Sequence, residues 1–238
     1  MVKKKGNRTR ASQAFPLYAA ATGQNNIFNL PQQKDPNKED ERKRILRDAY
    51  WKTLEEYVKL DDLKFPKDQK MVVMVLELDC GEALEARTLC AYLKRGKNRL
   101  EEVNNFLYYG IENDQQAIKT AKQNYEKNNP QQHSLVTTKL FNFEEQIPDY
   151  LPEMAVLTLN NLNIKKRLEC EWKTLIQEGM ACLRKGGILI ATLNYTGDAP
   201  AFRQIIGNEC DIHRDRKNIF APKEYPETYD HIIVGRKR

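Results

Sequence analysis

The chain lacks the sequence features of several common protein classes. It contains only five cysteines in 238 residues, and none of them forms a Cys-x-x-Cys pair. Scattered cysteines in an odd number predict reduced thiols in a cytoplasmic protein, and they favour neither a disulfide framework nor a structural zinc site. The longest apolar run is far shorter than the roughly 20 residues that cross a membrane, and no apolar segment follows the basic N-terminus. We therefore expect neither a membrane span nor a secretory signal.

Histidine is also scarce. The three histidines, His133, His213 and His231, are dispersed, and His231 stands just before an apolar run, where a structural role is the simpler interpretation. The chain has no Ser-His-Asp order, no His-Glu-x-x-His motif and no Gly-x-x-x-x-Gly-Lys-Ser/Thr motif. These absences argue against the familiar hydrolase triads, zinc proteases and P-loop nucleotidases, and we predict no metal site.

Basic charge is concentrated at the N-terminus. The net charge is +6; the first ten residues hold five basic side chains and no acid, whereas the other 228 hold 34 basic and 33 acidic side chains. The near-neutral body gives no bulk argument for a nucleic-acid-binding surface. Residues 1–34 are interpreted as a basic tail that either stays disordered or contacts an acidic partner, anionic lipid or RNA through residues 1–10. Apolar patches at 15–18 and 27–30 favour a third interpretation, in which part of the tail docks on the body as a lid.

The most informative stretch is residues 71–83. Six apolar residues at positions 71–76 are typical of a strand buried on both faces in a parallel sheet. Glu77, Asp79 and Gly81 follow, and a helical apolar pattern then continues to about residue 95. A strand, a tight turn with acids and glycine, and a helix open a nucleotide-binding βαβ unit, whose ligands lie beyond the carboxyl ends of the strands. The sequence therefore predicts the binding site at this turn.

The rest of the chain alternates strands with helices. Asp35-Pro36 predicts the start of a helix that ends near residue 60 and packs on the core, within an accessory segment of residues 35–66. Residues 67–238 then form the main domain. After the strand at 71–79 and the helix at 82–95, strands are predicted at 106–112, 135–141, 154–160, 188–193, 210–220 and 231–235, and helices at 117–125, 168–183 and 198–206. The glycines at 186 and 187 are expected to end the helix at 168–183. With no helix between the last two strands, the pattern gives an α/β sheet that ends in a hairpin.

Four junctions in this order resemble the class I S-adenosylmethionine-dependent methyltransferases. Residues 75–83 look like that family's first motif, acid-x-Gly-x-Gly-x-Gly, at the end of the first strand. Residues 109–112, Tyr-Gly-Ile-Glu, look like the end of its second strand. Residues 183–190 are similar to its Leu-x-x-Gly-Gly-x-Leu entry into the fifth strand, and the closing pair of strands matches its reversed seventh strand. The resemblance spans about residues 70–235.

The resemblance implies a fold and an activity. The fold would be a three-layer, Rossmann-like α/β sheet of seven strands, mostly parallel with an antiparallel C-terminal strand, plus the N-terminal helical extension. The activity would be transfer of a methyl group from S-adenosylmethionine to an unidentified polar acceptor, at N or O. The chain departs from the motif because Asp79 and Ala83 occupy the first and third glycine positions. A shifted register, with Asp79 as the motif acid, would place Glu85 at the third glycine position.

Seven residues at the strand ends are the implied cofactor contacts: Glu77, Asp79, Gly81, Glu112, Asn113, Asn142 and Phe143. In the family an acid at the position of Glu112 holds the ribose hydroxyls; alternatively it is an ordinary acid that opens a helix. Glu77 and Asp79 would face the cationic amino-acid end of the cofactor, and Gly81 would give its backbone room. Asn113 would help to place the adenine or would cap the helix, and Phe143 would cover the ring or belong to the core.

The acceptor would lie beside the ends of the fourth and fifth strands. The residues expected there are Asn160, Asn161, Asn163 and Tyr195, with Asn194 facing the same mouth. Carboxamides donate and accept hydrogen bonds and could orient an amine or hydroxyl, but asparagines are also common in turns. The family's Asn-Pro-Pro-Tyr signature is absent.

Two rival functions remain at this stage. The chain could be a catalytically weak or silent member of the fold that acts as an interaction module, as the substitutions at positions 79 and 83 favour. A nicotinamide-dependent oxidoreductase would need Gly-x-Gly-x-x-Gly, which the turn does not supply.

Overall fold

A computed structural model describes residues 36–59, 72–95, 105–112, 114–126, 136–142, 153–164 and 169–238. By its internal contacts the chain divides into two units, Met1–Asp35 and Pro36–Arg238, and every described element belongs to the second. The predictions for the tail, including its role as a lid or as a contact for RNA or an acidic partner, lie outside the described residues. The predicted boundaries at 34 and 66 stay predictions.

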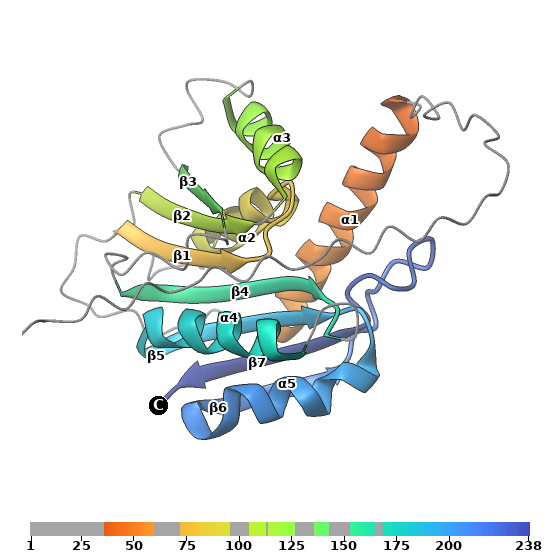
Figure 1. Cartoon of the computed structure of the whole chain (residues 1–238). Helices are drawn as coiled ribbons and strands as arrows, with labels where there is room; N and C mark the ends of the chain where they lie inside the picture. Colours follow the sequence, from red (N-terminus) through yellow and green to blue (C-terminus); the bar gives the residue numbers. More distant parts are fainter. Residues whose placement is uncertain are drawn as a thin grey trace, which may run out of the picture. The chain divides into compact units, whose positions relative to one another are not determined.

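The core of the second unit is a seven-stranded sheet with the order β3-β2-β1-β4-β5-β7-β6 (Figure 1). Its strands are β1 (Val72–Leu78), β2 (Asn105–Glu112), β3 (Val136–Asn142), β4 (Met154–Leu162), β5 (Leu183–Leu193), β6 (Cys210–Lys217) and β7 (His231–Lys237). The pairs from β3 to β5 are parallel, and β7 runs antiparallel to both of its neighbours. The predicted sheet of seven strands with a reversed C-terminal strand is therefore confirmed.

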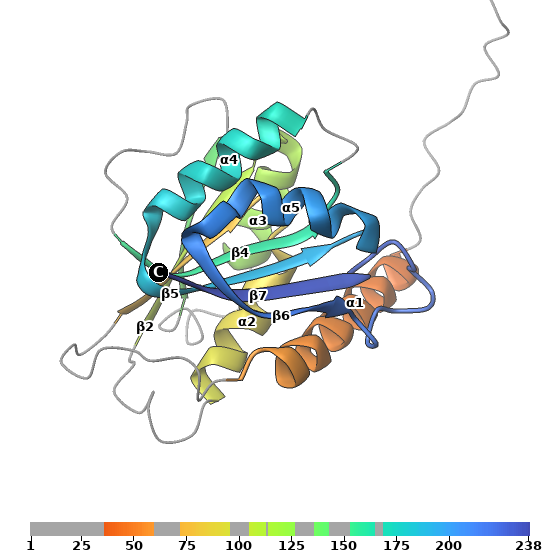
Figure 2. The ribbon, with the colours of Figure 1, turned by 90° about the horizontal axis from the view of Figure 1, so that it is seen from below.

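Helices cover both faces of the sheet, so the fold has three layers (Figure 2). One face carries α1 (Pro36–Tyr57), α2 (Leu84–Arg95) and α3 (Gln115–Glu126); the other carries α4 (Glu169–Cys182) and α5 (Ala199–Ile206). Side chains of β1 divide between the two faces because successive residues of a strand point in opposite directions. Val73 and Val75 join the core under α1 and α2, whereas Leu76 and Leu78 join the core under α4 and α5. Among the described residues, no helix is long and apolar enough to cross a membrane.

Helix α1 is fastened to the loop between β6 and β7. The rings of Tyr50 and Tyr229 lie 5.5 Å apart, and the buried Thr53 hydroxyl accepts a hydrogen bond from Asn218 Nδ2 at 2.8 Å. The Arg42 guanidinium lies 5.6 Å from the centre of the Tyr225 ring. These contacts bring the loop onto the same face of the sheet as α1 and α2.

Several element boundaries differ from the prediction by a few residues. Helix α4 ends at Cys182 and β5 begins directly at Leu183, so the glycines at 186 and 187 lie inside the strand and do not end the helix. The physical reason is an irregularity in the sheet: Gly186 has φ +74°, and the pairing of β4 with β5 shifts register between Met154 and Val156. Strand β6 stops at Lys217, three residues short of the predicted end.

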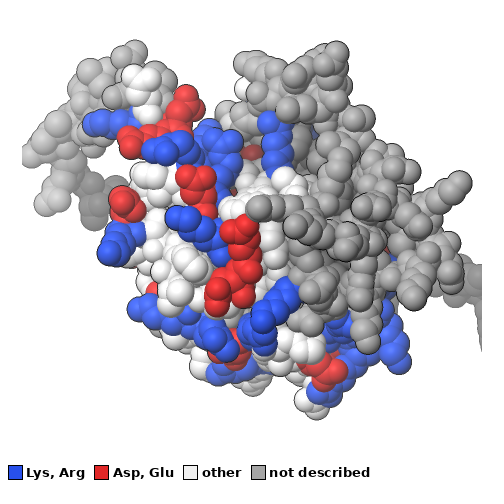
Figure 3. All heavy atoms as spheres, turned by 180° about the vertical axis from the view of Figure 1, so that it is seen from behind, with Lys and Arg blue, Asp and Glu red and all other residues white. Residues whose placement is uncertain are grey.

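Acidic and basic side chains alternate on the face that carries α1. In the described part of that face, lysine and arginine lie between aspartate and glutamate without an extended region of one sign (Figure 3). This agrees with the near-neutral composition of the sequence beyond residue 10.

Candidate functional site

The turn between β1 and α2 has the backbone of a glycine-rich loop. Asp79, Gly81 and Ala83 have φ of +57°, +51° and +53°, so all three alternate positions of the motif are left-handed. That conformation is free for glycine and costs roughly 1–2 kcal/mol for most other residues. The turn thus keeps the glycine geometry although two of the three glycines are replaced. The shifted register does not fit, because Glu85 lies inside α2.

Glu112 holds this turn against the start of α3. Its Oε2 accepts a hydrogen bond from the backbone N–H of Gly81 at 2.7 Å, and its Oε1 accepts one from the N–H of Asp114 at 2.9 Å. The side chain is 5% exposed. The backbone N–H of Cys80 also donates to the carbonyl of Ile111 at 3.0 Å, so the turn is tied to the end of β2 twice. A carboxylate that accepts two backbone N–H groups is a positioned acceptor.

Glu77 is buried beside two polar partners on the same face of the sheet. It is 1% exposed; its carboxylate accepts hydrogen bonds from the Tyr108 hydroxyl and, at 2.7 Å, from Asn160 Nδ2. Burial and the nearby Glu85 carboxylate raise the pKa of Glu77 to about 8, although both hydrogen bonds act in the opposite direction. Glu77 pairs with Gly110 on β2, two residues before Glu112. The two acids therefore point to the same side of the sheet.

A second buried acid, Glu85, links three distant segments. The Tyr229 hydroxyl donates to Glu85 Oε1, and Asn161 Nδ2 lies 3.5 Å from the same oxygen. The backbone N–H of Tyr229 donates to Asn161 Oδ1 at 3.1 Å. Asn161 and Tyr229 both have positive φ, of +58° and +57°. Burial raises the pKa of Glu85, against the effect of the Tyr229 hydrogen bond. Two strained residues thus meet at a buried carboxyl next to the end of β4.

The sequence did not point to Glu85 or Tyr229 as members of the site. A usable signal existed for Glu85, because it stands four and seven residues before Leu89 and Tyr92, on the buried stripe of α2. An acid on a buried helical face must find partners within the protein. No comparable signal marks Tyr229, which is 144 residues away from Glu85.

The predicted acceptor residues divide between the two faces of the sheet. Asn160 joins Glu77, and Asn161 joins Glu85. The carbonyl of Asn163 instead accepts a hydrogen bond from Trp172 Nε1 of α4 at 3.2 Å. Tyr195 follows β5 and is half-buried, and a hydrogen bond with Glu227 raises its pKa.

Asn194 offers an unused acceptor at the same edge of the sheet. Its backbone N–H donates to the carbonyl of Leu162 at 2.9 Å and fixes the end of β5 beside the end of β4. Its Oδ1 is buried, and no described residue donates a hydrogen bond to it.

Three predicted cofactor contacts are only partly described. Asn142 ends β3 and pairs with Glu112, which brings its backbone to the predicted edge. Asn113 and Phe143 lie outside the described residues. Among those that are described, no group of three or more His, Cys, Asp or Glu side chains is placed to hold a metal ion.

No family model and no curated protein matches the sequence. Solved structures do resemble the fold. TrmN from Thermus thermophilus aligns with a TM-score of 0.54 and 14% identity over 79% of this chain, but only 48% of that chain is covered. The plantazolicin methyltransferase BpumL in complex with SAH aligns with a TM-score of 0.51 and 12% identity, over 86% of this chain and 92% of that chain. The glycopeptide N-methyltransferase MtfA aligns with a TM-score of 0.51 and 8% identity, over 70% of this chain and 89% of that chain. The chain therefore has the fold of the class I S-adenosylmethionine-dependent methyltransferases.

Proposed function

We propose that this protein is a methyltransferase that uses S-adenosylmethionine to methylate a polar acceptor at N or O. The observation that carries the proposal is the turn at 79–83, whose three left-handed positions stand between β1 and α2 and are hydrogen-bonded to the acid that ends β2. The sheet order and the reversed β7 place this turn at the carboxyl edge of the parallel strands, where α/β proteins bind nucleotides. Two of the fold neighbours are methyltransferases by name.

Space and charge at the turn fit the cofactor. A Cβ built on Gly81 would meet no atom of the described residues within 4 Å, so this side of its backbone leaves room for close approach by a ligand. Burial raises the pKa of the Cys80 thiol, and the nearby carboxylates of Glu77, Glu112 and Asp79 raise it further, which places three acids around one turn. A cofactor with an ammonium and a sulfonium group is attracted by such a cluster.

Each acid has a distinct role in this proposal. Glu112 would accept hydrogen bonds from the ribose hydroxyls in addition to those from Gly81 and Asp114. Glu77 and Asp79 would attract the ammonium group of the amino-acid end. Asn113, Asn142 and Phe143 would surround the adenine.

The acceptor would lie beside the ends of β4 and β5. When bound, S-adenosylmethionine supplies an electrophilic methyl group. The residues of this chain would orient the acceptor: Asn194 Oδ1 can take a hydrogen bond from an amine or hydroxyl, and Asn160, Asn161 and Tyr195 border the same edge. Asn163 is better explained as a support for α4 through Trp172. Orientation of the acceptor in a dry pocket contributes much of the rate in a direct displacement.

The hydrogen bonds and the burial of Glu77 and Glu112 favour a second function, that of a catalytically silent interaction module. Both oxygens of Glu77 and both of Glu112 already accept hydrogen bonds from the protein, and both side chains are almost fully buried. A fold member that had lost its ligand could keep these bonds to stabilise the turn.

Calorimetric titration with S-adenosylmethionine and S-adenosylhomocysteine separates the two functions. A methyltransferase should bind both, and Glu112→Ala should weaken binding by about 1.5–3 kcal/mol, the range for a hydrogen bond to a charged group. Asp114→Ala is the matched control. Asp114 Oδ1 caps α3 through the N–H groups of Gln116 and Ala117, so its loss loosens the same helix start without removing the ribose acceptor.

Two results would contradict the proposal. The absence of heat and of thermal stabilisation at millimolar ligand would leave only the interaction module. Equal losses in the Glu112→Ala and Asp114→Ala variants would show that Glu112 acts through the position of α3 and does not hold the ribose.

A further inference from the structure

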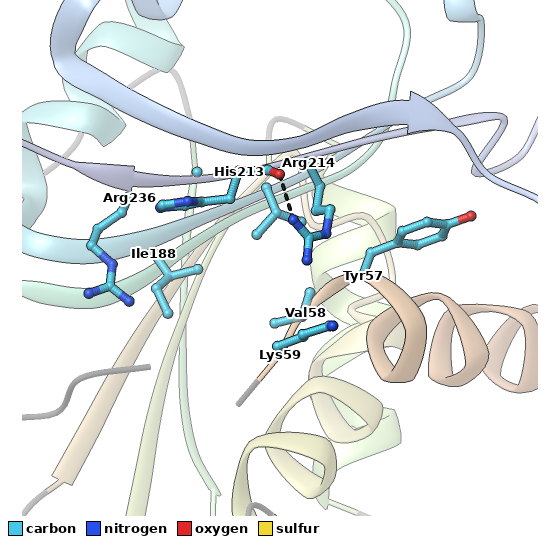
Figure 4. A pocket seen from close by; sticks show the side chains of 9 residues that line it. Tyr57, Val58, Lys59, Ile188, His213, Arg214 and Arg236 are labelled. Atoms are coloured by element: carbon cyan, nitrogen blue, oxygen red, sulfur yellow. Dashed lines mark hydrogen bonds between the residues drawn. The ribbon is translucent and has the colours of Figure 1, made fainter. Parts of the chain in front are cut away.

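A basic pocket lies between the end of α1 and the strands β5, β6 and β7. Its charged lining consists of Lys59, Arg214 and Arg236, with the ring of His213 beside them (Figure 4). Val58 and Ile188 contribute an apolar wall. Among the described residues, no acidic side chain lines the pocket. Three cations gathered around one cavity form a local excess of positive charge in a near-neutral body.

The charges of this pocket are not neutralised by the described residues. The nearby acids are engaged elsewhere: Asp211 accepts from Arg238 Nε at 2.6 Å, and Asp215 accepts from Arg203 and His231. Arg214 Nη1 donates only to a backbone carbonyl, that of His213, at 2.8 Å. Arg236 Nε is buried and has no hydrogen-bond partner among the described residues. A buried guanidinium N–H without an acceptor is costly, and an anion bound to the exposed part of the Arg236 side chain would offset its charge.

The chemistry of the lining points to phosphate. Guanidinium groups present paired N–H donors that match the oxygens of a phosphate group, and lysine adds a compact charge. The apolar wall suits the organic part of an ester better than a free inorganic ion. The alternating charges over the described part of this face (Figure 3) do not make the extended basic track that a polyanion follows. We propose that this pocket binds the phosphate group of a nucleotide-sized phosphate ester.

The pocket is separate from the proposed methyl-transfer site. Ile188 pairs with Arg236 at the middle of β5, whereas Leu193 pairs with His231 at its carboxyl end. Five residues of strand span roughly 16 Å. A change at Arg236 should therefore leave cofactor binding at the turn unaltered. The phosphate site can thus be tested independently of the methyltransferase proposal.

Binding of uridine 5′-monophosphate to the full chain, measured by calorimetry and thermal shift, tests the proposal. A pyrimidine avoids competition with the adenosine site proposed above, and uridine serves as the phosphate-free ligand. Inorganic phosphate and a short single-stranded oligouridylate are the other two probes. We expect the nucleotide to bind and uridine not to bind. If the oligouridylate binds and the mononucleotide does not, the proposal of a nucleotide-sized ligand is wrong.

Variants locate the binding. Arg214→Ala and Arg236→Ala should each weaken nucleotide binding about tenfold or more, as expected for a charged hydrogen bond. Arg236→Lys keeps the charge and serves as a check on folding. It should lose less affinity for the nucleotide than Arg236→Ala. Arg216→Ala is the matched control, because this exposed arginine lies on the same strand as Arg214 but outside the lining. Equal binding of uridine and its monophosphate, or an equal loss in the Arg216→Ala variant, would overturn the proposal.

Discussion

The buried carboxyl of Glu77 makes the stability of the protein depend on pH in an unusual direction. Its pKa is raised to about 8, from an ordinary value of 4.5, because the side chain is buried and lies near Glu85. The folded protein therefore holds a proton that the unfolded chain releases at lower pH. This contribution to stability is fully present below about pH 4.5 and is lost as the pH rises through 8. Each pH unit within that window corresponds to about 1.4 kcal/mol.

Replacement of Glu77 by glutamine should remove this dependence. Between about pH 6 and pH 8 the free energy of unfolding of the parent protein should fall by about 2–3 kcal/mol relative to that of Glu77→Gln. Glutamine can keep both contacts, because the Tyr108 hydroxyl can accept as well as donate and the amide of Asn160 can turn over. Urea unfolding at several pH values measures the difference, and Glu209→Gln, at an exposed acid, is the control.

The same residue links binding to proton release. An ammonium group next to Glu77 would favour the ionised carboxylate and lower its pKa. Affinity for S-adenosylmethionine should then rise with pH up to about 8, and titrations in buffers of different ionisation enthalpy should detect release of a proton. Both effects should vanish in Glu77→Gln. If the free energy of unfolding changes equally in the parent protein and in Glu77→Gln between pH 6 and pH 8, the reasoning about the buried carboxyl is refuted. If the affinity for S-adenosylmethionine does not change with pH, Glu77 does not contact the ammonium group.

Three further variants test local features by urea unfolding at neutral pH. Asp79→Gly should raise the free energy of unfolding by about 0.5–1 kcal/mol because glycine relieves the left-handed strain, and a loss would show that the contacts of Asp79 outweigh that strain. Tyr229→Phe should lower it by about 1–3 kcal/mol because Glu85 loses its closest donor; an unchanged value would mean that Glu85 is satisfied without the hydroxyl. Thr53→Val should lower it by about 1–2 kcal/mol because the amide of Asn218 is left without its buried acceptor, and wild-type stability would argue that the loop simply shifts.

The sequence predicted the sheet and the turn because both depend on local patterns. The apolar run of β1 and the alternation of strands with helices are periodic signals, and they lead to the observed order of elements. The turn was found although two glycines are missing, because acid, glycine and small residue recur at every second position. The structure shows the reason that this spacing matters: positions 79, 81 and 83 share one backbone conformation.

The interior of the site could not be predicted in the same way. Glu112 was recognised as an acid at a strand end, but its acceptance of the Gly81 N–H depends on the pairing of β1 with β2. Backbone donors leave no trace in a sequence pattern. The contact between Glu85 and Tyr229 joins α2 to a loop 144 residues later, and it arises only because that loop packs on α1. The basic pocket is likewise assembled from separate elements, and none of its basic residues belongs to a recognisable motif.

The choice between an enzyme and a silent module comes down to whether the ligand adds to the hydrogen bonds of Glu112 or replaces them. Addition would leave the Gly81 and Asp114 bonds in place, so the ribose would meet an acceptor that is already oriented, and little reorganisation would oppose binding. Replacement would leave a backbone N–H unsatisfied, at about 1–3 kcal/mol, and would offset most of the gain from the ribose contact. The open space beside Gly81 favours addition, because the backbone on that side meets no atom of the described residues within 4 Å. The left-handed turn is then a preformed binding feature, and the strain at Asp79 and Ala83 persists because Glu112 holds it in place.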